Sequence, residues 1–297
     1  MALLYGTHLI LRGIGYNDIS TVWAVRILKG FSLKILYCGD LVGRSGRNAI
    51  IKHLNQIKDK YKIDVTIVNA ENAAHGFGLS PSIAEDLIKA GVDGITTGNH
   101  IWQQREIYPF LDSSNKIIRP LNYPSNLPGK GARVLEIGGK KILIMQVLGR
   151  LFMPPIGSIV EPIDEVLKFY TLGKNVDAIL VDIHGEATSE KLALGYYLDG
   201  RVSAVCGTHT HVPTADARVL PNGTGYITDV GMCGDFESVL GFEIDAPMER
   251  LAEKHTVQNR LNPANGKELT VWGVVIDIDK SGKCESITQI KEVYPNM

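Results

Sequence analysis

Five apolar runs in this 297-residue chain each end in a short polar stretch whose side chains can bind a metal ion. Runs of this kind are typical of buried strands, and the polar ends of neighbouring parallel strands meet at one edge of a sheet. The fold must therefore accommodate several charged or polar groups at one place. The side chains concerned are Asp40, Glu71, Asn72, Asn99, His100, His184, His209 and His211.

The last of these stretches, Gly207-Thr208-His209-Thr210-His211, is the most informative. In an extended backbone, residues two apart project to the same side, so the imidazoles of His209 and His211 can both face one ion. A single Gly-Asp, Asn-Glu-Asn or histidine after a strand is more often a turn or a buried, hydrogen-bonded group than a ligand. Five such coincidences in one chain are far more specific than any one of them, and together they favour a metal centre.

The chemistry of these donors favours two transition-metal ions over one. The carboxylates of Asp40 and Glu71 are hard ligands, the imidazoles are borderline ligands, and Asn99 can add a carbonyl oxygen. One ion seldom takes six protein side chains while keeping an open position, whereas two ions about 3.5–4 Å apart can share a bridging carboxylate. The mixture suits iron, manganese or zinc better than calcium, which prefers oxygen ligands alone.

The composition argues against several classes of partner. The formal net charge is −1, so the chain as a whole has no electrostatic attraction for duplex nucleic acid or a membrane surface. No apolar run approaches the roughly 18–20 residues that cross a bilayer, and no signal peptide is evident. The four cysteines are scattered without a C-x-x-C pair, so we expect free thiols and a reduced, cytoplasmic setting.

The order of the expected elements indicates an α/β fold. Strands and helices alternate over residues 33–97, which predicts parallel strands with right-handed crossovers. The first helix is expected after a glycine-containing turn at residues 41–47, and the second begins with Ser80 as cap and Pro81 as first helical residue. The apolar face of the first helix is expected to contain Ile50, Ile51, Leu54 and Ile57.

The second half of the chain is richer in strands. Gly138-Gly139 separates two strand-like runs and predicts a hairpin. Further strands are expected before His184 and in the C-terminal third of the chain, so we expect a second sheet packed on the first within one domain. The proline- and glycine-rich residues 119–131 predict a loop that serves as a lid or rim over the site.

Residues 1–32 are expected to form an N-terminal extension outside a domain that spans residues 33–297. The first convincing core strand begins at Leu33, and charged residues interrupt the apolar character of the segment before it. The extension is a mobile arm, a docking segment or sequence upstream of the native start, and these alternatives stay open. We expect no catalytic role for it.

From residue 33 onward the chain resembles the calcineurin-like metallophosphoesterases, in particular the bacterial YmdB-type phosphodiesterase family. The resemblance rests on motifs that contain all the candidate ligands. They are Gly39-Asp40-Leu41-Val42-Gly43, Asn69-Ala70-Glu71-Asn72, Gly98-Asn99-His100, residues 182–191 (DIHGEATSEK), residues 199–211 (DGRVSAVCGTHTH) and Thr228-Asp229-Val230-Gly231-Met232.

This resemblance implies a four-layer α/β/β/α sandwich of two mixed sheets, with helices outside and a dinuclear site between the sheet edges. Glu71 would bridge the ions, and His100 would be a non-ligand histidine that contacts the scissile phosphate. Val42 stands where most members of the wider superfamily have a metal-binding histidine. The first ion would be held by Asp40, Glu71 and His211 with Asn72 nearby, and the second by Glu71, Asn99, His184 and His209.

The activity implied is hydrolysis of small phosphodiesters, above all 2′,3′-cyclic nucleotides, with two ions activating a water molecule. Divalent or mixed-valence iron or manganese is expected, with zinc as an alternative, in a homo-oligomer. Phosphomonoesterase activity, cleavage of short RNA and nucleotide sensing with slow turnover stay open. The candidate substrate-binding cations are Arg44, Arg47, Arg119 and Arg150, although an arginine at any one of these positions is more often an ordinary surface or structural residue.

Overall fold

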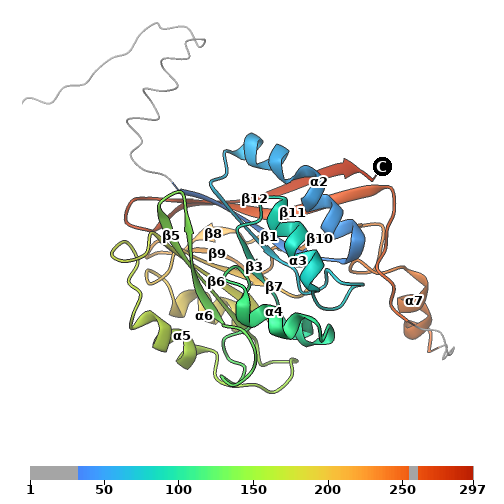
Figure 1. Cartoon of the computed structure of the whole chain (residues 1–297), viewed down its shortest axis with the longest axis horizontal. Helices are drawn as coiled ribbons and strands as arrows, with labels where there is room; N and C mark the ends of the chain where they lie inside the picture. The colour runs from blue at the N-terminus through green and yellow to red at the C-terminus, as the bar shows by residue number, and fades with distance from the viewer. Residues whose placement is uncertain (1–32, 254–259, 297) are drawn as a thin grey trace, which may run out of the picture.

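Two six-stranded sheets packed face to face form the centre of the molecule (Figure 1). They are seen in a computed structural model that describes residues 33–253 and 260–296. The expected N-terminal extension, residues 1–32, lies outside the described residues. Both sheets are mixed, because each combines neighbouring parallel strands with antiparallel strands at an edge.

The first sheet has the strand order β12-β11-β1-β2-β3, and β10 pairs with the end of β1. Strands β1, β2 and β3 are parallel, so their carboxyl ends lie at the same edge. This edge receives the polar residues that follow each of these strands. The strands are β1 (Leu33–Leu41), β2 (Val65–Asn69), β3 (Gly94–Thr96), β10 (Met232–Cys233), β11 (Glu268–Ile278) and β12 (Cys284–Pro295).

The second sheet has the order β4-β5-β6-β7-β9-β8, with β5, β6, β7 and β9 parallel. The predicted hairpin is confirmed, since Gly138 and Gly139 join β4 to β5 with φ of 54° and 78°. Positive φ at both positions matches the right-handed twist of the flanking strands. The strands are β4 (Ala132–Ile137), β5 (Lys140–Leu148), β6 (Ala178–His184), β7 (Ala204–Thr208), β8 (Arg218–Val219) and β9 (Gly225–Ile227).

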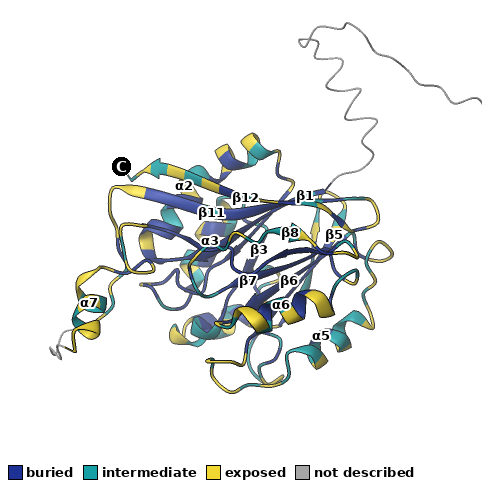
Figure 2. Cartoon of the chain, turned by 180° about the vertical axis from the view of Figure 1, so that it is seen from behind, coloured by how far each residue is buried: buried dark blue, intermediate teal, exposed yellow. Residues whose placement is uncertain are grey.

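Helices cover the outer face of each sheet, which gives the predicted four layers (Figures 1 and 2). One apolar cluster fills the space between the sheets, a second lies under α2, α3 and α4, and a third lies under α5 and α6. Helix α7 stands apart from these layers. The helices are α2 (Gly43–Tyr61), α3 (Pro81–Lys89), the 3-10 helix η1 (Asn99–Gln103), α4 (Ile107–Ser113), α5 (Val160–Leu167), α6 (Thr188–Tyr197) and α7 (Asp245–Leu251).

The start of α2 differs from the sequence prediction. The helix begins at Gly43, directly after β1, so residues 41–47 do not form a separate turn. A Cβ atom at Gly46 would lie only 2.5 Å from the carbonyl oxygen of Cys233, so this glycine permits close packing of the helix on the sheet. The rotation of α2 about its own axis leaves the Ile51 side chain 38% exposed, whereas Ile50, Leu54 and Ile57 face the core as expected.

The start of α3 agrees with the sequence. Ser80 Oγ accepts a hydrogen bond from the backbone N–H of Ile83, and Pro81 is the first helical residue. The four cysteines are free and buried. Across residues 33–253 and 260–296, none of the helices combines the length and the apolar character needed to span a bilayer.

Candidate metal centre

The carboxyl ends of the parallel strands in the two sheets meet at one place, and all the predicted ligands lie there. Asp40 lies at the end of β1, Glu71 follows β2, and His184 ends β6. The turn after β7 ties the sheets together, because the backbone N–H of His209 donates to Asp40 Oδ2 at 3.0 Å. The predicted site at a sheet edge is thus a single buried cluster built from both sheets.

Two groups of ligand atoms are present, and Glu71 belongs to both. In each group the ligand atoms lie within 4.8 Å of one another. Among the described residues, one group contains Glu71, His184 and His209, and the other contains Asp40, Glu71 and His211. A carboxylate shared by two adjacent groups is the arrangement expected of a bridging ligand.

Nitrogen Nε2 of His184 is the focus of the first group. It lies 3.2 Å from Glu71 Oε1, 3.2 Å from Asn99 Oδ1 and 3.1 Å from His209 Nδ1. One ring nitrogen carries at most one proton, so it cannot make a hydrogen bond to all three atoms. A cation among these atoms would satisfy all of them together.

In His184 and His211, the ring nitrogen Nδ1 faces an oxygen atom, and this contact fixes the orientation of the ring. His184 Nδ1 lies 2.9 Å from Thr208 Oγ1, which in turn donates to the buried Asp182. His211 Nδ1 lies 2.9 Å from the carbonyl oxygen of Leu240. A metal-binding imidazole usually donates the N–H of its second ring nitrogen to an oxygen atom. This hydrogen bond fixes the ring and leaves the first nitrogen to bind the ion.

Asp40 supplies an independent test of whether a cation fits. Its Oδ1 is buried without a hydrogen-bond partner, and burial raises the pKa of the carboxyl group well above its usual value. A buried carboxylate needs a compensating charge or several hydrogen bonds. Asp40 and the convergent donors around His184 therefore fit one bound cation each. The neighbouring Asn72 Oδ1 lies 3.3 Å from His211 Nε2, beside the second group.

The conformation of the His209-Thr210-His211 turn corrects one sequence prediction. His209 and His211 have φ of 101° and 65°, so the backbone is not extended there. The two imidazoles consequently lie in different groups, so the extended geometry in which both could face one ion is not the one observed. Non-glycine residues seldom adopt positive φ, and such strain is common at functional sites.

A buried ion pair holds this turn in place. Lys191 Nζ donates to the carbonyl oxygen of Thr208 at 2.7 Å and to Asp229 Oδ2 at 2.8 Å. Asp229 Oδ2 also accepts the backbone N–H of Thr210 at 3.0 Å. Lys191 and Asp229 are fully buried, so removal of either one would leave an uncompensated charge under the ligands.

His100 lies beside the two groups and belongs to neither. Its backbone N–H donates to Glu71 Oε2 at 3.2 Å, and its side chain lines the cavity in front of the ligands. Burial lowers the pKa of His100, and the charge of Glu71 opposes this effect. His100 is therefore held against the bridging carboxylate with its ring available to a molecule in the cavity.

Gly98 makes this close approach possible. A Cβ atom there would overlap Glu71 Oε2 and lie 2.7 Å from His184 Nε2. The backbone at Gly98 is extended, with φ of 179°, so any residue could adopt its conformation. The need for glycine is purely one of space beside the ligands.

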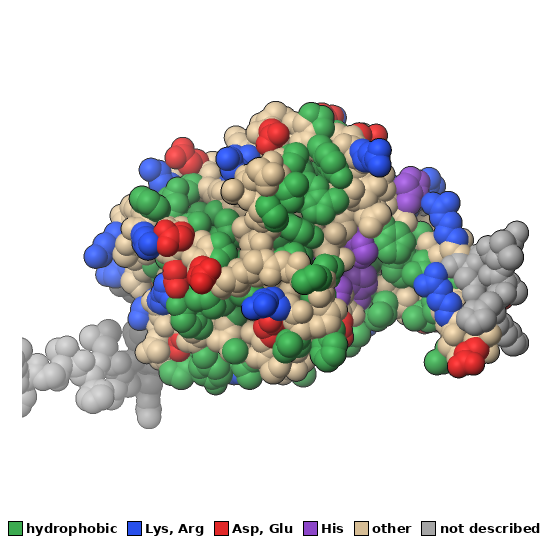
Figure 3. Space-filling view, turned by 90° about the horizontal axis from the view of Figure 1, so that it is seen from below, with side chains coloured by type: hydrophobic (Ala, Val, Ile, Leu, Met, Phe, Trp, Pro, Cys, Tyr) green, Lys and Arg blue, Asp and Glu red, His purple; other side chains and the backbone are tan. Residues whose placement is uncertain are grey.

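The cavity in front of the ligands has a volume of about 490 Å³ and opens on the face shown in Figure 3. In that view histidine side chains lie at a hollow with hydrophobic side chains beside them. The loop at residues 119–131, expected as a lid or rim, contributes nothing to the lining. The lining residues are Glu71, Asn72, Phe77, His100, Glu186, His209, Thr210, His211, Val239, Leu240, Phe242, Pro247, Arg250 and Leu261.

None of the four candidate substrate-binding arginines lines this cavity. Arg119 is buried and donates to carbonyl groups of its own loop, including those of Pro120 and Pro128, so its role there is structural. Arg44 and Arg47 line a separate cavity of about 220 Å³. Arg150 lies on the surface near Glu190, to which its backbone N–H donates.

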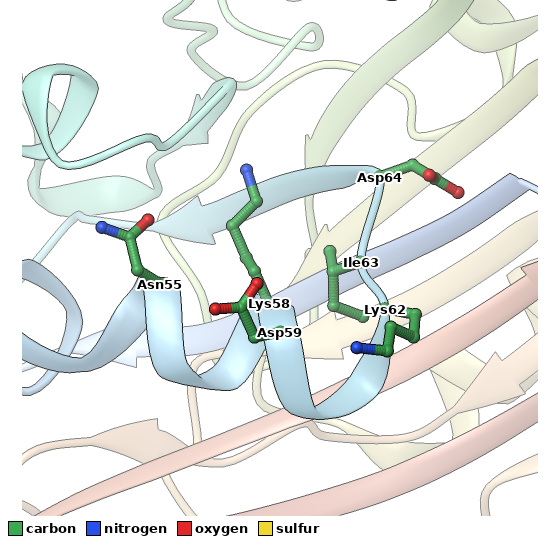
Figure 4. Close-up of a pocket in the computed structure, with 6 residues that line it drawn as sticks. All are labelled: Asn55, Lys58, Asp59, Lys62, Ile63 and Asp64. Carbon is green, nitrogen blue, oxygen red and sulfur yellow. The ribbon is translucent and has the colours of Figure 1, made fainter.

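A further cavity, of about 400 Å³, lies at the opposite end of the parallel strands (Figure 4). Lys58, Asp59 and Lys62 at the end of α2, together with Asp64 before β2, surround it. Both signs of charge are present, and neither group of potential metal ligands found in the described chain includes these residues. It lies at the amino end of β2, so we assign it no part in the site.

Three features of the site were not predicted from the sequence. They are the carbonyl group of Leu240 behind His211, the buried pair of Lys191 and Asp229, and the apolar side chains that line the cavity at Val239, Leu240, Phe242, Pro247 and Leu261. The lysine and aspartate lie within the motifs quoted above but carried no assigned role. The wall residues have no periodicity or motif that would distinguish them from an ordinary surface loop.

The electrostatics of the site without metal predict that metal binding releases protons. Burial lowers the pKa of His184, but the charge and hydrogen bond of Glu71 outweigh it and raise the pKa to about 9. His184 Nε2 is therefore protonated at neutral pH, and a metal must displace that proton. We expect the apparent affinity for Mn²⁺ to rise by about tenfold per pH unit below pH 9 and to level off above it.

Calorimetric titration of the metal-free protein in buffers of different ionisation enthalpy measures the released protons directly. At least one proton per chain is expected to be released near neutral pH. An affinity for Mn²⁺ that does not change between about pH 6 and pH 9 contradicts the assignment of His184 as a ligand.

The fold and the two ligand groups define the class of the protein: it is related to the metallophosphoesterases. A 2′,3′-cyclic-nucleotide 2′-phosphodiesterase of Bacillus subtilis (strain 168) is 46% identical over 251 residues, which cover 84% of this chain and 93% of that protein. The crystal structure of a novel phosphatase from Mycoplasma pneumoniae superposes with a TM-score of 0.80 at 36% identity, covering 90% and 95% of the two chains. A hypothetical protein from Thermus thermophilus has the same TM-score at 41% identity, covering 89% and 100%.

The family described as "YmdB-like protein" matches residues 36–290. The chain belongs to this family. The match covers most of the described chain, including all eight predicted site residues.

Proposed function

We propose that this protein is a dinuclear-metal phosphodiesterase that hydrolyses small phosphodiesters, with 2′,3′-cyclic nucleotides as its substrates. The observation that carries the proposal is the position of His100 on the cavity wall, beside two ligand groups that share Glu71. The similarity to the 2′,3′-cyclic-nucleotide 2′-phosphodiesterase of Bacillus subtilis supports the choice of substrate.

The proposed ligands are Asp40, Glu71, Asn72 and His211 for one ion and Glu71, Asn99, His184 and His209 for the other. When bound, such ions supply Lewis acidity to the phosphate and lower the pKa of a water molecule. Iron or manganese is proposed, with zinc as the alternative, because the ligands mix oxygen and imidazole nitrogen. Val42 is buried and offers no ligand atom, so Asn72 is the neutral donor proposed beside Asp40 and His211.

His100 is the proposed catalytic acid. Opening of the five-membered cyclic phosphate breaks the bond between phosphorus and the ribose 2′-oxygen, which needs a proton as it leaves. The negative phosphodiester in the cavity favours the protonated form of His100 and so opposes the lowering of its pKa by burial. Glu71 holds the backbone of His100 through its Oε2, which keeps the ring at a fixed position beside the ions.

Assays of the purified protein with 2′,3′-cyclic AMP, 3′,5′-cyclic AMP and p-nitrophenyl phosphate test the substrate class. We expect 2′,3′-cyclic AMP to have the highest kcat/KM and to yield a single nucleoside monophosphate. Phosphomonoesterase activity is the second candidate, favoured by the phosphatase structure from Mycoplasma pneumoniae. Faster hydrolysis of p-nitrophenyl phosphate than of the cyclic nucleotide overturns the first proposal in favour of the second.

The wider predictions from the sequence stay predictions. They are a cytoplasmic location, a homo-oligomeric state and a single domain at residues 33–297. Size-exclusion chromatography with light scattering measures the oligomeric state of the full chain.

A further inference from the structure

The wall of the cavity next to His100 is aromatic. The ring centroid of Phe77 lies 5.0 Å from that of His100, with an edge-to-face angle of 74°. The ring centroid of Phe77 also lies 5.4 Å from that of Phe242, with an interplanar angle of 27°. Both phenylalanines line the cavity, so an aromatic pair extends directly from the proposed catalytic histidine.

The loop that presents Phe77 is held in one conformation. Its neighbours Gly76 and Gly78 have φ of 87° and 85°, and a Cβ atom at Gly76 would lie 2.6 Å from the Phe242 ring. The backbone N–H of Phe77 donates to the carbonyl oxygen of Ala74, and its own carbonyl accepts from Gln104 Nε2, both at 2.9 Å. The ring is therefore pre-positioned, which lowers the entropic cost of binding against it.

The loop is also tied to the proposed metal ligands. Asn72 Nδ2 donates to the carbonyl oxygen of Gly76 at 2.9 Å, while Asn72 Oδ1 faces His211. Asn72 thus links the loop that carries Phe77 directly to the proposed ligand His211. A molecule whose phosphate lies at the ligands would place its adjoining group against Phe77.

Further apolar side chains on this wall are partly exposed. Val239 and Leu240 are 38% and 47% exposed, and Leu261 lines the cavity with them. Leu240 has φ of 55°, and the carbonyl oxygen of the same residue supports His211. Apolar side chains left open beside a charged centre are characteristic of a site for a ligand that has both a charged and an apolar part.

We propose that Phe77 and Phe242 form a nucleobase platform, against which the base of the substrate packs while its phosphate lies beside His100. The inference rests on the proposed function and specifies how the same site selects a nucleotide over other phosphodiesters. Bases of every kind have a π-face, so the platform accepts all four and favours purines by their larger area. Phe242 is only 8% exposed and stacks on Phe77, so Phe77 is the residue whose replacement tests the platform.

The experiment compares Phe77→Leu with the unmodified protein on two esters. The first is 2′,3′-cyclic AMP, and the second is glycerol 1,2-cyclic phosphate, which has the same five-membered ring but no base. We expect kcat/KM for 2′,3′-cyclic AMP to fall by about 5- to 150-fold, the range that corresponds to loss of one base–aromatic stacking contact. The value for glycerol 1,2-cyclic phosphate should stay unchanged, and Phe77→Tyr should retain activity on both.

Phe169→Leu is the matched control, since this phenylalanine is 73% exposed and does not line the cavity. Metal content and thermal unfolding of each variant verify that the site is intact. An equal loss on both esters overturns the platform, because Phe77 would then act only by positioning His100. Unchanged activity on both esters overturns it as well. If the unmodified protein hydrolyses neither ester, the proposed function itself is wrong, and the proposal of a nucleobase platform is then wrong as well.

Discussion

Replacement of Glu71 by alanine is expected to remove both metal ions and to abolish turnover. Glu71 belongs to both ligand groups, so its loss takes one charged donor from each. It also leaves His184 and the backbone N–H of His100 without their carboxylate partner. We expect metal content to fall from about two ions per chain toward zero and kcat/KM for 2′,3′-cyclic AMP to fall by at least about 10³-fold.

Metal analysis after dialysis, together with the hydrolysis assay, measures both effects on one preparation. Glu85→Ala is the control, because Glu85 is an exposed residue of α3 outside both ligand groups. Circular dichroism establishes that each variant is folded. A Glu71→Ala protein that keeps both ions and its activity contradicts the bridging role.

Replacement of His100 by alanine is also expected to abolish most turnover, but with both metal ions retained. The His100 side chain is in neither ligand group, so both ions should stay bound. Loss of a positioned acid typically lowers the rate by about 10²–10⁴-fold. The change should appear in kcat, because the contact strengthens as the leaving oxygen gains charge.

The leaving group provides the sharper test of the role of His100. p-Nitrophenolate departs without a proton, so His100→Ala should lose much less activity on bis-p-nitrophenyl phosphate than on 2′,3′-cyclic AMP. His75→Ala is the matched control, since His75 is exposed and lines the separate cavity with Arg44 and Arg47. Loss of metal from the His100 variant, or equal losses on both esters, contradicts the role of acid.

The positions of the ligands could be predicted because they depend on strand ends. Asp40, Glu71 and His184 each follow an apolar run, and parallel strands bring such ends to one edge whatever the details of packing. The sequence pattern by itself predicts a second sheet packed on the first, and the four-layer order follows only from the resemblance to a known family. The length of the apolar runs predicts strands and the two hairpin glycines predict the turn, and both predictions need only the local sequence.

What could not be predicted depends on contacts between segments that are distant in the sequence. His209 and His211 have positive φ in a turn that Asp229 and Lys191 hold by hydrogen bonds, and no local pattern distinguishes this turn from a strand that continues. The start of α2 was misplaced because Gly46 resembles a turn residue, whereas it provides room for the backbone at Cys233. Arg119 likewise carries the signal of a substrate-binding cation but donates to its own loop.

The measurement that tests the central claim most directly is the metal dependence of 2′,3′-cyclic AMP hydrolysis by the purified full chain. Metal-free protein would be titrated with Mn²⁺ or, without oxygen, with Fe²⁺, and bound metal and turnover would be followed together. The account predicts about two ions per chain at saturation and turnover that appears only as both sites fill. No bound transition metal, and no activity after manganese or iron is added, would contradict it.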